Sequence, residues 1–547
     1  MSASSKKKLR SEQDAAKLTE RQLAEQKEAK TVKAYTIGFV VVLVILVAVA
    51  LFVSGHQLIV NSGVREKNTV AVTVGDHEVN TVEFNYFYTD VVNNFMQQYG
   101  SLISMIGIDT TKPLNEQILD PESGDTWADK FVVDAKDSIA TVYALADAAE
   151  AAGYTLPEDL QSQTDIMLSN MDAYAAMSGM SSAKSYLRAV YGHGADLDSY
   201  RSYVELSMLA QSYQQVYAES LTYDDAALRE AEKENYNEFS SFTYNEVYLG
   251  SSSFLTGGTT AEDGTVTYSD EEKAAALKAA EAAANALADG SVKSVADFDA
   301  AVAAIEFTSE SAPTASTAVV NKEYASISEP IAQWLSDSAR KEGDISVIPS
   351  TSETMNEEGT PEEITNGYYV VYFTSVNDNT YALPNVRHIL VSFEGGTPDE
   401  AGNVTYSEEE KSAAKTKAEE LLAQWEAGDK TEDSFAALAA ENSTDPGSKE
   451  NGGLYEDIAP GQMVPTFNDW CFDESRKAGD TGIVETSYGY HVMYFSGDSE
   501  TTYRDLQIRN KLTAADFEAW FKNLVDSITV TDGDVSFVRT DMVLGGR

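Results

Sequence analysis

Two histidines lie in matching apolar runs and are the residues of this sequence best suited to chemistry. His388 lies within 386–391 and His491 within 488–495. An imidazole can donate or accept a proton near neutral pH, and its hydrogen-bond partners set its tautomer. The polar loop between the two runs contains Asp445, which could also be a plain turn residue before a Pro-Gly pair. A lone strand histidine is usually structural, but the matching contexts favour a functional interpretation of the segment that joins them.

The domain around these residues is one of two copies of an internal repeat. The segment 264–273 recurs as 402–411, and an alanine-rich stretch with a helical pattern follows each copy. Trp334 returns as Trp470. Repetition at this spacing predicts two copies of one α+β domain, at 240–376 and at 384–498.

The two copies differ at the histidines. Glu246 takes the position of His388 in the first copy, and Tyr369 takes the position of His491. The polar loop 442–453 has no clear counterpart there. The first copy keeps the pattern of the fold but lacks the two histidines. This difference predicts that the second copy is active and that the first is degenerate.

The segments on either side of the repeat are expected to be helical. Residues 69–239 begin with a short strand pattern and continue with repeated apolar and aromatic residues at helical spacing, which favours packing surfaces over a cofactor site. No metal-ligand spacing or phosphate-binding loop occurs there, so we expect no metal and no cofactor. The tail 501–547 contains an amphipathic helix whose apolar face must be buried. That face consists of Phe517, Trp520, Phe521 and Leu524.

The N-terminal region has the pattern of a membrane anchor. Residues 1–33 carry nine Lys or Arg and five acids, whereas 34–54 are apolar and 55–68 form a polar linker. An apolar run of about 20 residues can span a bilayer as a helix. The basic flank places the N-terminus in the cytoplasm and the bulk of the chain outside it, as a single-pass protein of the cell membrane. A cleaved signal peptide is the alternative, because 48–50 resemble a cleavage site.

The net charge argues against one class of protein, and the cysteine content excludes one type of covalent cross-link. The formal net charge of −49 argues against a nucleic-acid-binding protein, because phosphate backbones require a basic surface. Cys471 is the only cysteine, so an intramolecular disulfide is excluded. Trp470 and Phe472 flank Cys471, which is typical of a small buried hydrophobic residue.

An ordered series of motifs in the second copy resembles a known family. Residues 385–497 are similar to a parvulin-type peptidyl-prolyl cis/trans isomerase domain, and the chain as a whole resembles the membrane-attached PrsA/SurA-like foldases of bacteria. The matching segments are 387–391, 443–445, 452–454, 461–467, 479–480 and 488–491.

The resemblance implies a fold and a set of site residues. His388, Asp445 and His491 would be the catalytic residues, and Leu454, Met463 and Phe467 would line the pocket for the proline ring. Met463 and Phe467 could also be plain core residues, and His491 could simply support His388. The expected architecture has a mostly helical chaperone-like domain at 69–239, completed by the C-terminal helix, and two α+β copies inserted before that helix.

The same resemblance implies a function. The chain would isomerise X–Pro bonds in unfolded or newly exported proteins and act as a chaperone. The basic cluster that phosphate-directed members carry is replaced here by 392–396, so phosphorylated substrates are not expected. Two alternatives are a non-catalytic holdase and a cell-surface interaction protein that uses the repeats as binding modules. Whether two chains pair as a homodimer is left open.

Overall fold

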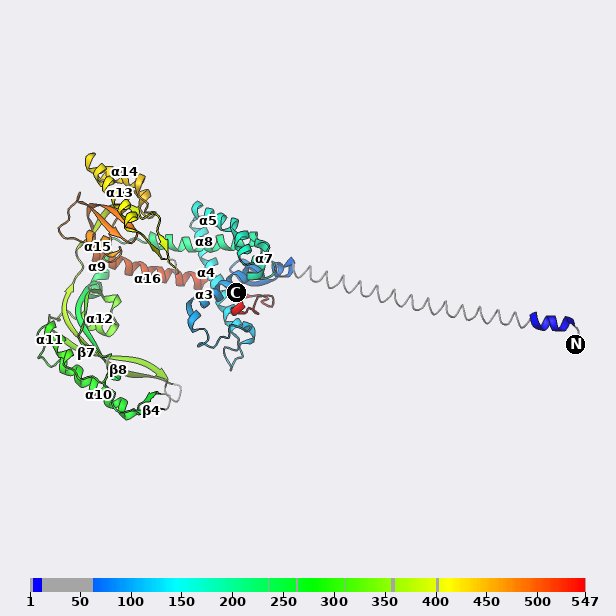
Figure 1. The fold of residues 1–547 in the computed structure, drawn as a ribbon, viewed down its shortest axis with the longest axis horizontal. Helices are drawn as coiled ribbons and strands as arrows, with labels where there is room; N and C mark the ends of the chain where they lie inside the picture. Colours follow the sequence, from blue (N-terminus) through cyan, green and yellow to red (C-terminus); the bar gives the residue numbers. More distant parts are fainter. Residues whose placement is uncertain are drawn as a thin grey trace. The chain divides into compact units, whose positions relative to one another are not determined.

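The computed structural model describes residues 3–11, 62–234, 236–261, 264–309, 311–355, 360–399 and 403–546. The expected anchor at 34–54 lies outside these ranges. Within them, no helix combines the length and the apolar character needed to cross a bilayer. The described chain mixes helices and strands and divides into two compact units (Figure 1). Unit 1 is Met1–Leu221 with Asp516–Arg547, and unit 2 is Thr222–Ala515.

Unit 1 is mostly helical and contains one small antiparallel sheet of order β15-β1-β2. Asn80 caps the first long helix by accepting hydrogen bonds from two backbone N–H groups, and Thr126 and Asp129 form a capping box on the next. Aromatic and aliphatic side chains from these helices form a single core. The elements are α2 (Val64–Asn68), β1 (Val70–Val74), β2 (His77–Asn80), α3 (Thr81–Tyr99), α4 (Trp127–Ala151), α5 (Glu158–Ser169), α6 (Met171–Met177), α7 (Ala183–Tyr191), α8 (Leu197–Ser220) and β15 (Val530–Asp532).

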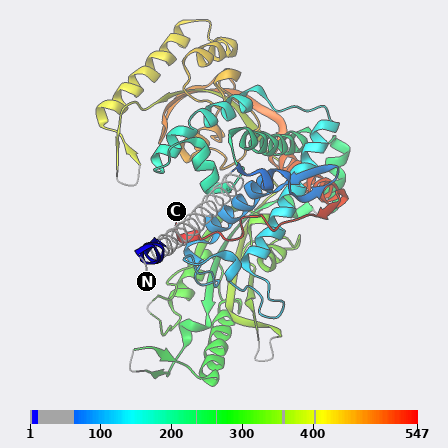
Figure 2. The ribbon, with the colours of Figure 1, turned by 90° about the vertical axis from the view of Figure 1, so that its right-hand side faces the viewer.

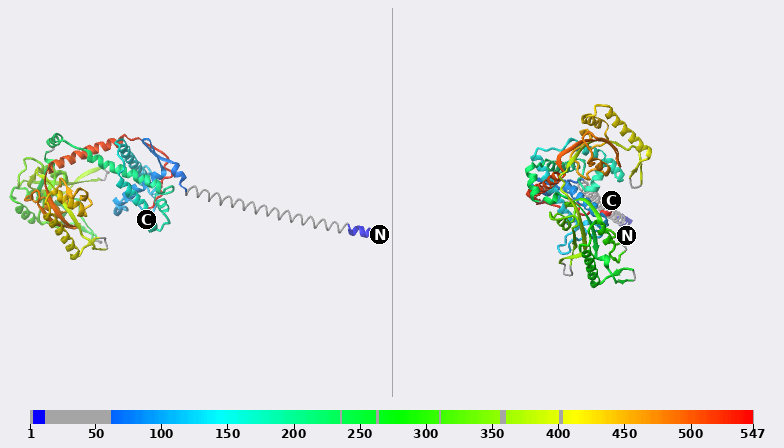
Figure 3. Two further views of the ribbon diagram at one scale, coloured as in Figure 1. Left: turned by 90° about the horizontal axis from the view of Figure 1, so that it is seen from above. Right: turned by 90° about the vertical axis from the view of Figure 1, so that its left-hand side faces the viewer.

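The end of the chain returns to unit 1. The long helix α16 (Tyr503–Ser527), drawn in red in Figure 3, belongs to unit 2 in its first half and to unit 1 from Asp516 onward. Trp520 stacks on Tyr217 of α8 with ring centroids 3.6 Å apart. The strand β15 then pairs with β1. Segments from both ends of the sequence therefore contribute to one helical unit.

Unit 2 contains two modules built on the same plan. The first module (241–377) has a four-stranded sheet of order β6-β3-β8-β7, and the second module (382–502) has a sheet of order β12-β9-β14-β13. The first is formed by β3 (Ser241–Gly250), α10 (Asp270–Leu287), α11 (Val295–Ala303), β6 (Thr317–Glu323), α12 (Glu329–Leu335), β7 (Ile345–Met355) and β8 (Pro361–Asn377). The second is formed by β9 (Ala382–Ser392), α13 (Glu408–Ala427), α14 (Glu432–Asn442), β12 (Leu454–Tyr455), α15 (Pro465–Cys471), β13 (Thr481–Thr486) and β14 (Gly489–Thr502).

Each face of the second module's sheet has its own core. The helices α13 and α14, yellow in Figure 2, pack on the face that carries Ile389 and Val492. The short helix α15 packs on the opposite face, against Val386 and Met493. Successive residues of a strand point to opposite faces, so His388 shares the α15 face with Val386.

The modules differ most at one sheet edge. In the first module this edge is the seven-residue strand β6, which pairs with β3. In the second module it is the two-residue strand β12, and the polar loop 443–453 precedes it. The second module therefore has a loop beside its central strands where the first has a continuous strand.

The segments before and between the two modules meet the start of α16 at a buried arginine of unit 2. Arg504 is 1% exposed and donates hydrogen bonds to the Glu232 carboxylate (2.5 Å), to the Asp378 carbonyl (3.0 Å) and to the Tyr236 carbonyl. The Asn379 side chain, also buried, donates to the carbonyl of Phe239. These contacts join α9 (Asp225–Glu234), the turn before β3 and the linker between the modules to α16.

Candidate active site

The two histidines occupy the central strand pair of the second module. His388 on β9 pairs with Met493, and His491 on β14 pairs with Leu390, so the histidines are diagonal neighbours on one face. Their rings stack with centroids 5.1 Å apart, and their Nδ1 atoms are 2.9 Å apart. His388 is 2% exposed and His491 is 5% exposed. Antiparallel pairing thus brings together two residues that lie far apart in sequence.

A close backbone approach fixes the polar loop beside His388. The N–H of His388 donates to the carbonyl of Gly453 at 2.8 Å. A Cβ atom on Gly453 would lie 2.1 Å from the His388 carbonyl oxygen, and the φ angle there is +75°. Only glycine satisfies both conditions without a backbone shift. This contact anchors the end of loop 443–453 and so positions Asp445.

Asp445 accepts hydrogen bonds from three side chains. Its Oδ2 lies 3.0 Å from His388 Nε2 and accepts from the hydroxyls of Ser448 at 2.5 Å and Tyr455 at 3.0 Å. These bonds, that from His388 above all, hold the pKa of the Asp445 carboxyl well below its usual range, although partial burial opposes them. The carboxylate therefore stays ionised in the folded protein at neutral pH.

The opposite end of the network is formed by Thr486. Its hydroxyl lies 2.9 Å from Nε2 of His491. Burial, reinforced by the nearby His388, lowers the pKa of His491 to about 3. His491 is therefore a neutral imidazole at neutral pH, with one donor and one acceptor nitrogen.

The hydrogen bonds have a consistent direction along this chain. The ionised Asp445 only accepts, so His388 donates to it from Nε2. In the neutral form of His388, Nδ1 is then the acceptor, and His491 donates to it from its own Nδ1. His491 Nε2 in turn accepts from the hydroxyl of Thr486. The chain from Thr486 to Asp445 is thus a single ordered set of donors and acceptors.

An apolar floor lies against the stacked histidines. The ring of Phe467 on α15 makes edge contacts with both, at centroid distances of 5.4 Å to His388 and 5.3 Å to His491. Phe467 is 2% exposed, and Met463 packs against the same cluster with part of its side chain exposed. Cys471 is buried in this cluster, and burial raises the pKa of its thiol to about 12. A thiol of this kind is a packing group rather than a nucleophile.

The structure places Tyr455, rather than Leu454, on the face of the histidines. Leu454 pairs with Arg387, and Tyr455 pairs with Val386. Paired residues share a face, and Arg387 points to the α14 side, where it binds Glu432 at 2.9 Å. Leu454 therefore lies on the side away from His388, contrary to the sequence expectation of a pocket residue.

Five of the six residues expected from the sequence lie together at this site. They are His388, Asp445, His491, Met463 and Phe467. Sequence reasoning missed Ser448, Tyr455 and Thr486, which complete the hydrogen-bond network. The first two lie within or just after the polar loop that the first copy lacks, so the comparison of copies could have pointed to them. Thr486 gives no comparable signal.

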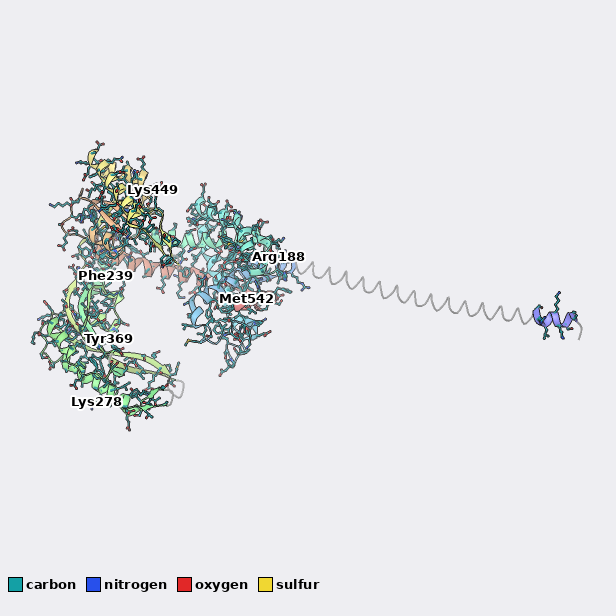
Figure 4. The ribbon with its side chains drawn as sticks, viewed as in Figure 1. Arg188, Phe239, Lys278, Tyr369, Lys449 and Met542 are labelled. Carbon is teal, nitrogen blue, oxygen red and sulfur yellow. The ribbon has the colours of Figure 1, made fainter. Side chains whose placement is uncertain are left out.

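The equivalent position in the first module has different chemistry. Glu246 pairs with Val371 and Tyr369 with Tyr248, in the same register as the pairs of the two histidines. Tyr369, labelled in Figure 4, packs its ring against Tyr248 at 4.9 Å. Burial raises the pKa of Glu246. In the part of the chain that the structure describes, no group of three or more His, Cys, Asp or Glu side chains is arranged to hold a metal ion.

Comparisons with known proteins agree on one domain. Residues 370–497 match the family model described as PPIC-type PPIASE domain. Foldase protein PrsA 1 of Listeria innocua is 31% identical over 122 residues, which are 20% of this chain and 42% of the relative. Foldase protein PrsA of Halalkalibacterium halodurans is 35% identical over 109 residues, 20% of this chain and 29% of the relative. This chain therefore covers less than half of the length of these relatives.

Two solved structures are similar to part of this chain. The crystal structure of PrsA from Bacillus subtilis is 26% identical, covers 26% of this chain and 48% of that chain, and has a TM-score of 0.18. The crystal structure of peptidylprolyl isomerase PrsA from Bacillus cereus is 27% identical, covers 27% of this chain and 49% of that chain, and has a TM-score of 0.17.

Proposed function

We propose that this chain, whose residues 370–497 form a PPIC-type peptidyl-prolyl isomerase domain, is an extracytoplasmic foldase that isomerises X–Pro bonds in exported proteins. The observation that best supports this proposal is the ordered network from Thr486 through His491 and His388 to Asp445, next to the apolar ring of Phe467. A proline ring needs an apolar surface, and its amide needs polar groups of fixed orientation. The site offers both within one module.

The reaction suits a site without a nucleophile. Rotation about an X–Pro amide has a barrier of about 18–20 kcal/mol, and the uncatalysed exchange takes tens to hundreds of seconds. In the twisted amide the nitrogen and carbonyl have lost their resonance, so a catalyst must bind that state better than the planar one. A thousandfold acceleration requires only about 4 kcal/mol of differential binding.

Each group of the site has a role in this scheme. Phe467 and Met463 hold the pyrrolidine ring through apolar contact, with the flexible thioether adapting to its shape. His388 is the proposed catalytic residue that contacts both the ring of Phe467 and the carboxylate of Asp445. Asp445 and His491 fix its orientation and its tautomer, so that its polar groups are already ordered when the amide twists.

The remaining parts of the proposal concern the rest of the chain. Residues 34–54 would anchor the protein in the cell membrane with its N-terminus in the cytoplasm, as the basic flank and apolar length favour. The helical unit 1 would bind unfolded clients as a chaperone domain completed by the end of α16. Its support is the packing of Trp520 on Tyr217 and the pairing of β15 with β1.

A refolding assay with a matched variant in the degenerate module tests the enzyme proposal. The full chain should accelerate the slow phase of a protein whose refolding is limited by prolyl isomerisation. His388→Ala should reduce this acceleration on the order of a hundredfold, because it removes the centre of the polar network. Glu246→Ala changes the corresponding residue of the first module and should leave the acceleration unchanged.

The same assay separates the alternatives. A chain that suppresses aggregation of the client without accelerating its slow phase would be a holdase, and the isomerase proposal would be wrong. Equal loss of acceleration in both variants would indicate a general effect on folding of unit 2, which circular dichroism of the two variants would reveal.

A further inference from the structure

A groove lies next to the catalytic network on the second module. Its volume is about 930 Å³. Five of its eleven lining residues are apolar or aromatic: Phe393 directly after β9, Val404 and Tyr406 on the following hairpin, Val464 directly before α15 and Pro465 at its start. Val404 is 45% exposed although it is a large hydrophobic residue. The groove thus has a partly exposed apolar side within a strongly acidic chain.

The groove wall is held in place by specific packing. The rings of Phe393 and Tyr406 have centroids 5.0 Å apart. Gly396 has a φ angle of +84°, and a Cβ atom there would lie 2.4 Å from Val404. Its N–H donates to the carboxylate of Glu410 at 2.9 Å, which ties the hairpin to α13. The apolar wall is therefore preorganised.

The groove is continuous with the catalytic centre through Thr486. This residue lines the groove and also contacts Nε2 of His491 at 2.9 Å. Thr466 lines it as well and directly precedes Phe467 in the chain. A peptide whose proline ring lies on Phe467 would therefore place a neighbouring residue at or beside the groove.

The charged groups of the groove are already partnered. Lys411 lies 3.8 Å from the carboxylate of Glu408. Glu485 accepts a hydrogen bond from the hydroxyl of Tyr490 at 2.7 Å. An ionic side chain entering the groove would have to compete with these contacts, whereas an apolar one would only displace water from Phe393, Val404 and Tyr406.

We propose that this groove is a specificity subsite that selects clients with a large apolar residue beside the isomerised proline. The proposal rests on the proposed isomerase function and adds the class of bond that the second module prefers. Phenylalanine and leucine are the expected occupants, because they fill an apolar groove that alanine leaves largely empty. The difference between a filled and an empty apolar subsite is worth roughly tenfold or more in kcat/KM.

A peptide series tests the subsite. Exchange NMR would measure kcat/KM of the full chain on peptides Ala-Xaa-Pro-Ala and Ala-Pro-Xaa-Ala, with Phe, Leu, Ala, Glu or Lys as Xaa. In one of the two series the Phe and Leu peptides should react about tenfold faster than the Ala peptide. Val404→Asp should remove that preference by placing a charge in the apolar wall.

The first module supplies a matched control. Val266 has the same place in the equivalent hairpin, with 43% exposure and the same contact with a positive-φ glycine, Gly258. Val266→Asp should leave the preference intact. Equal rates for all peptides, faster turnover of Glu or Lys peptides, or the same loss in both variants would overturn the subsite while leaving the isomerase proposal in place. No acceleration of any peptide would contradict the isomerase proposal itself.

Discussion

His491 is held in the neutral form by its surroundings, and this has consequences for the stability of the second module. It is 5% exposed, and burial and the neighbouring His388 lower its pKa to about 3. In an unfolded chain a histidine has a pKa of about 6.5. Between these two values the unfolded chain binds a proton that the folded chain does not bind.

The sign of the resulting pH dependence is fixed by this difference. Because the unfolded state binds more protons between about pH 6.5 and pH 3, the stability due to His491 is complete above pH 6.5 and is lost as the pH falls. The slope is at most about 1.4 kcal/mol per pH unit for one proton. We predict that the module loses stability from pH 6.5 to pH 5, and that His491→Asn, which cannot titrate, flattens this slope.

Hydrogen exchange of β14 in the full chain would measure this effect. If stability depends on pH equally in the unmodified chain and in His491→Asn, the neutral form of His491 is contradicted. The window above pH 5 is chosen because most carboxylates titrate below it. His77 is a useful control, because it is exposed and bound to Asp147, so His77→Asn should leave the exchange of β14 unaffected.

At the level of single residues, the sequence led to five residues that lie together in the structure and to one, Leu454, that faces away from them. His388 and His491 could be identified because the first module carries Glu246 and Tyr369 in the same register. The sequence could not show which of the neighbours Leu454 and Tyr455 faces His388. A shift of one residue in the register of a strand exchanges its two faces. The strand β12 has only two residues, so no alternation of apolar and polar residues could set the register.

At the level of elements, the two modules differ by one loop beside the paired histidines. Both sheets have the same order, but the strand β6 of the first module is replaced in the second by the loop 443–453 and the short β12. The loop supplies Asp445 and Ser448, and Lys449, labelled in Figure 4, lies in it. The repeat predicted the shared sheet, whereas the edge strand β6 could not be predicted, because its exposed residues give no regular apolar pattern.

The loop depends on one glycine, which gives a prediction at this scale. Gly453→Ala would place a Cβ atom 2.1 Å from the His388 carbonyl oxygen at a φ angle of +75°. Because backbone must move at the site itself, we expect a loss of stability of about 3 kcal/mol or more and loss of prolyl isomerase activity. Denaturant unfolding followed by the near-ultraviolet signal of the second module would measure the stability.

Gly479→Ala is the matched control for this variant. Gly479 also has a positive φ angle, +93°, but a Cβ atom there meets nothing within 4 Å. In this variant the free energy of unfolding should fall by only about 1–2 kcal/mol, the cost of placing alanine at a positive φ angle, and the activity should remain. Similar effects of the two substitutions would show that the close approach to His388 is not what requires glycine.

At the scale of the whole molecule, the chain leaves the helical unit, forms two modules and returns along α16. The sequence required burial of the face with Phe517 and Trp520, and the family resemblance implied its packing on the helical domain; Trp520 stacks on Tyr217 of α8. It did not predict how the modules are joined. Nothing in the sequence around Arg504 indicates its partners Glu232, Tyr236 and Asp378, because they are distant from it along the chain.

Arg504 gives the prediction that belongs to this scale. Its guanidinium is 1% exposed, binds the Glu232 carboxylate and lies 3.8 Å from the ring centroid of Tyr236. Arg504→Met keeps the length of the side chain but leaves the Glu232 carboxylate and two carbonyls without this partner. Removing one member of a buried ion pair costs about 3–5 kcal/mol. We therefore expect faster hydrogen exchange in α9 and in the linker 377–382 of the full chain.

The position of Arg504 in unit 2 provides a control variant. It also allows the stability of the junction to be measured separately from catalysis. Arg509 lies on the same helix, is partly exposed and contacts Thr501, so Arg509→Met should change exchange in these segments little. The network of His388, Asp445 and His491 contains no residue of the Arg504 cluster. Peptide isomerisation by Arg504→Met should therefore match that of the unmodified chain, because a short peptide needs only the second module. Loss of peptide turnover together with the faster exchange would instead mean that the second module depends on this junction for its own fold.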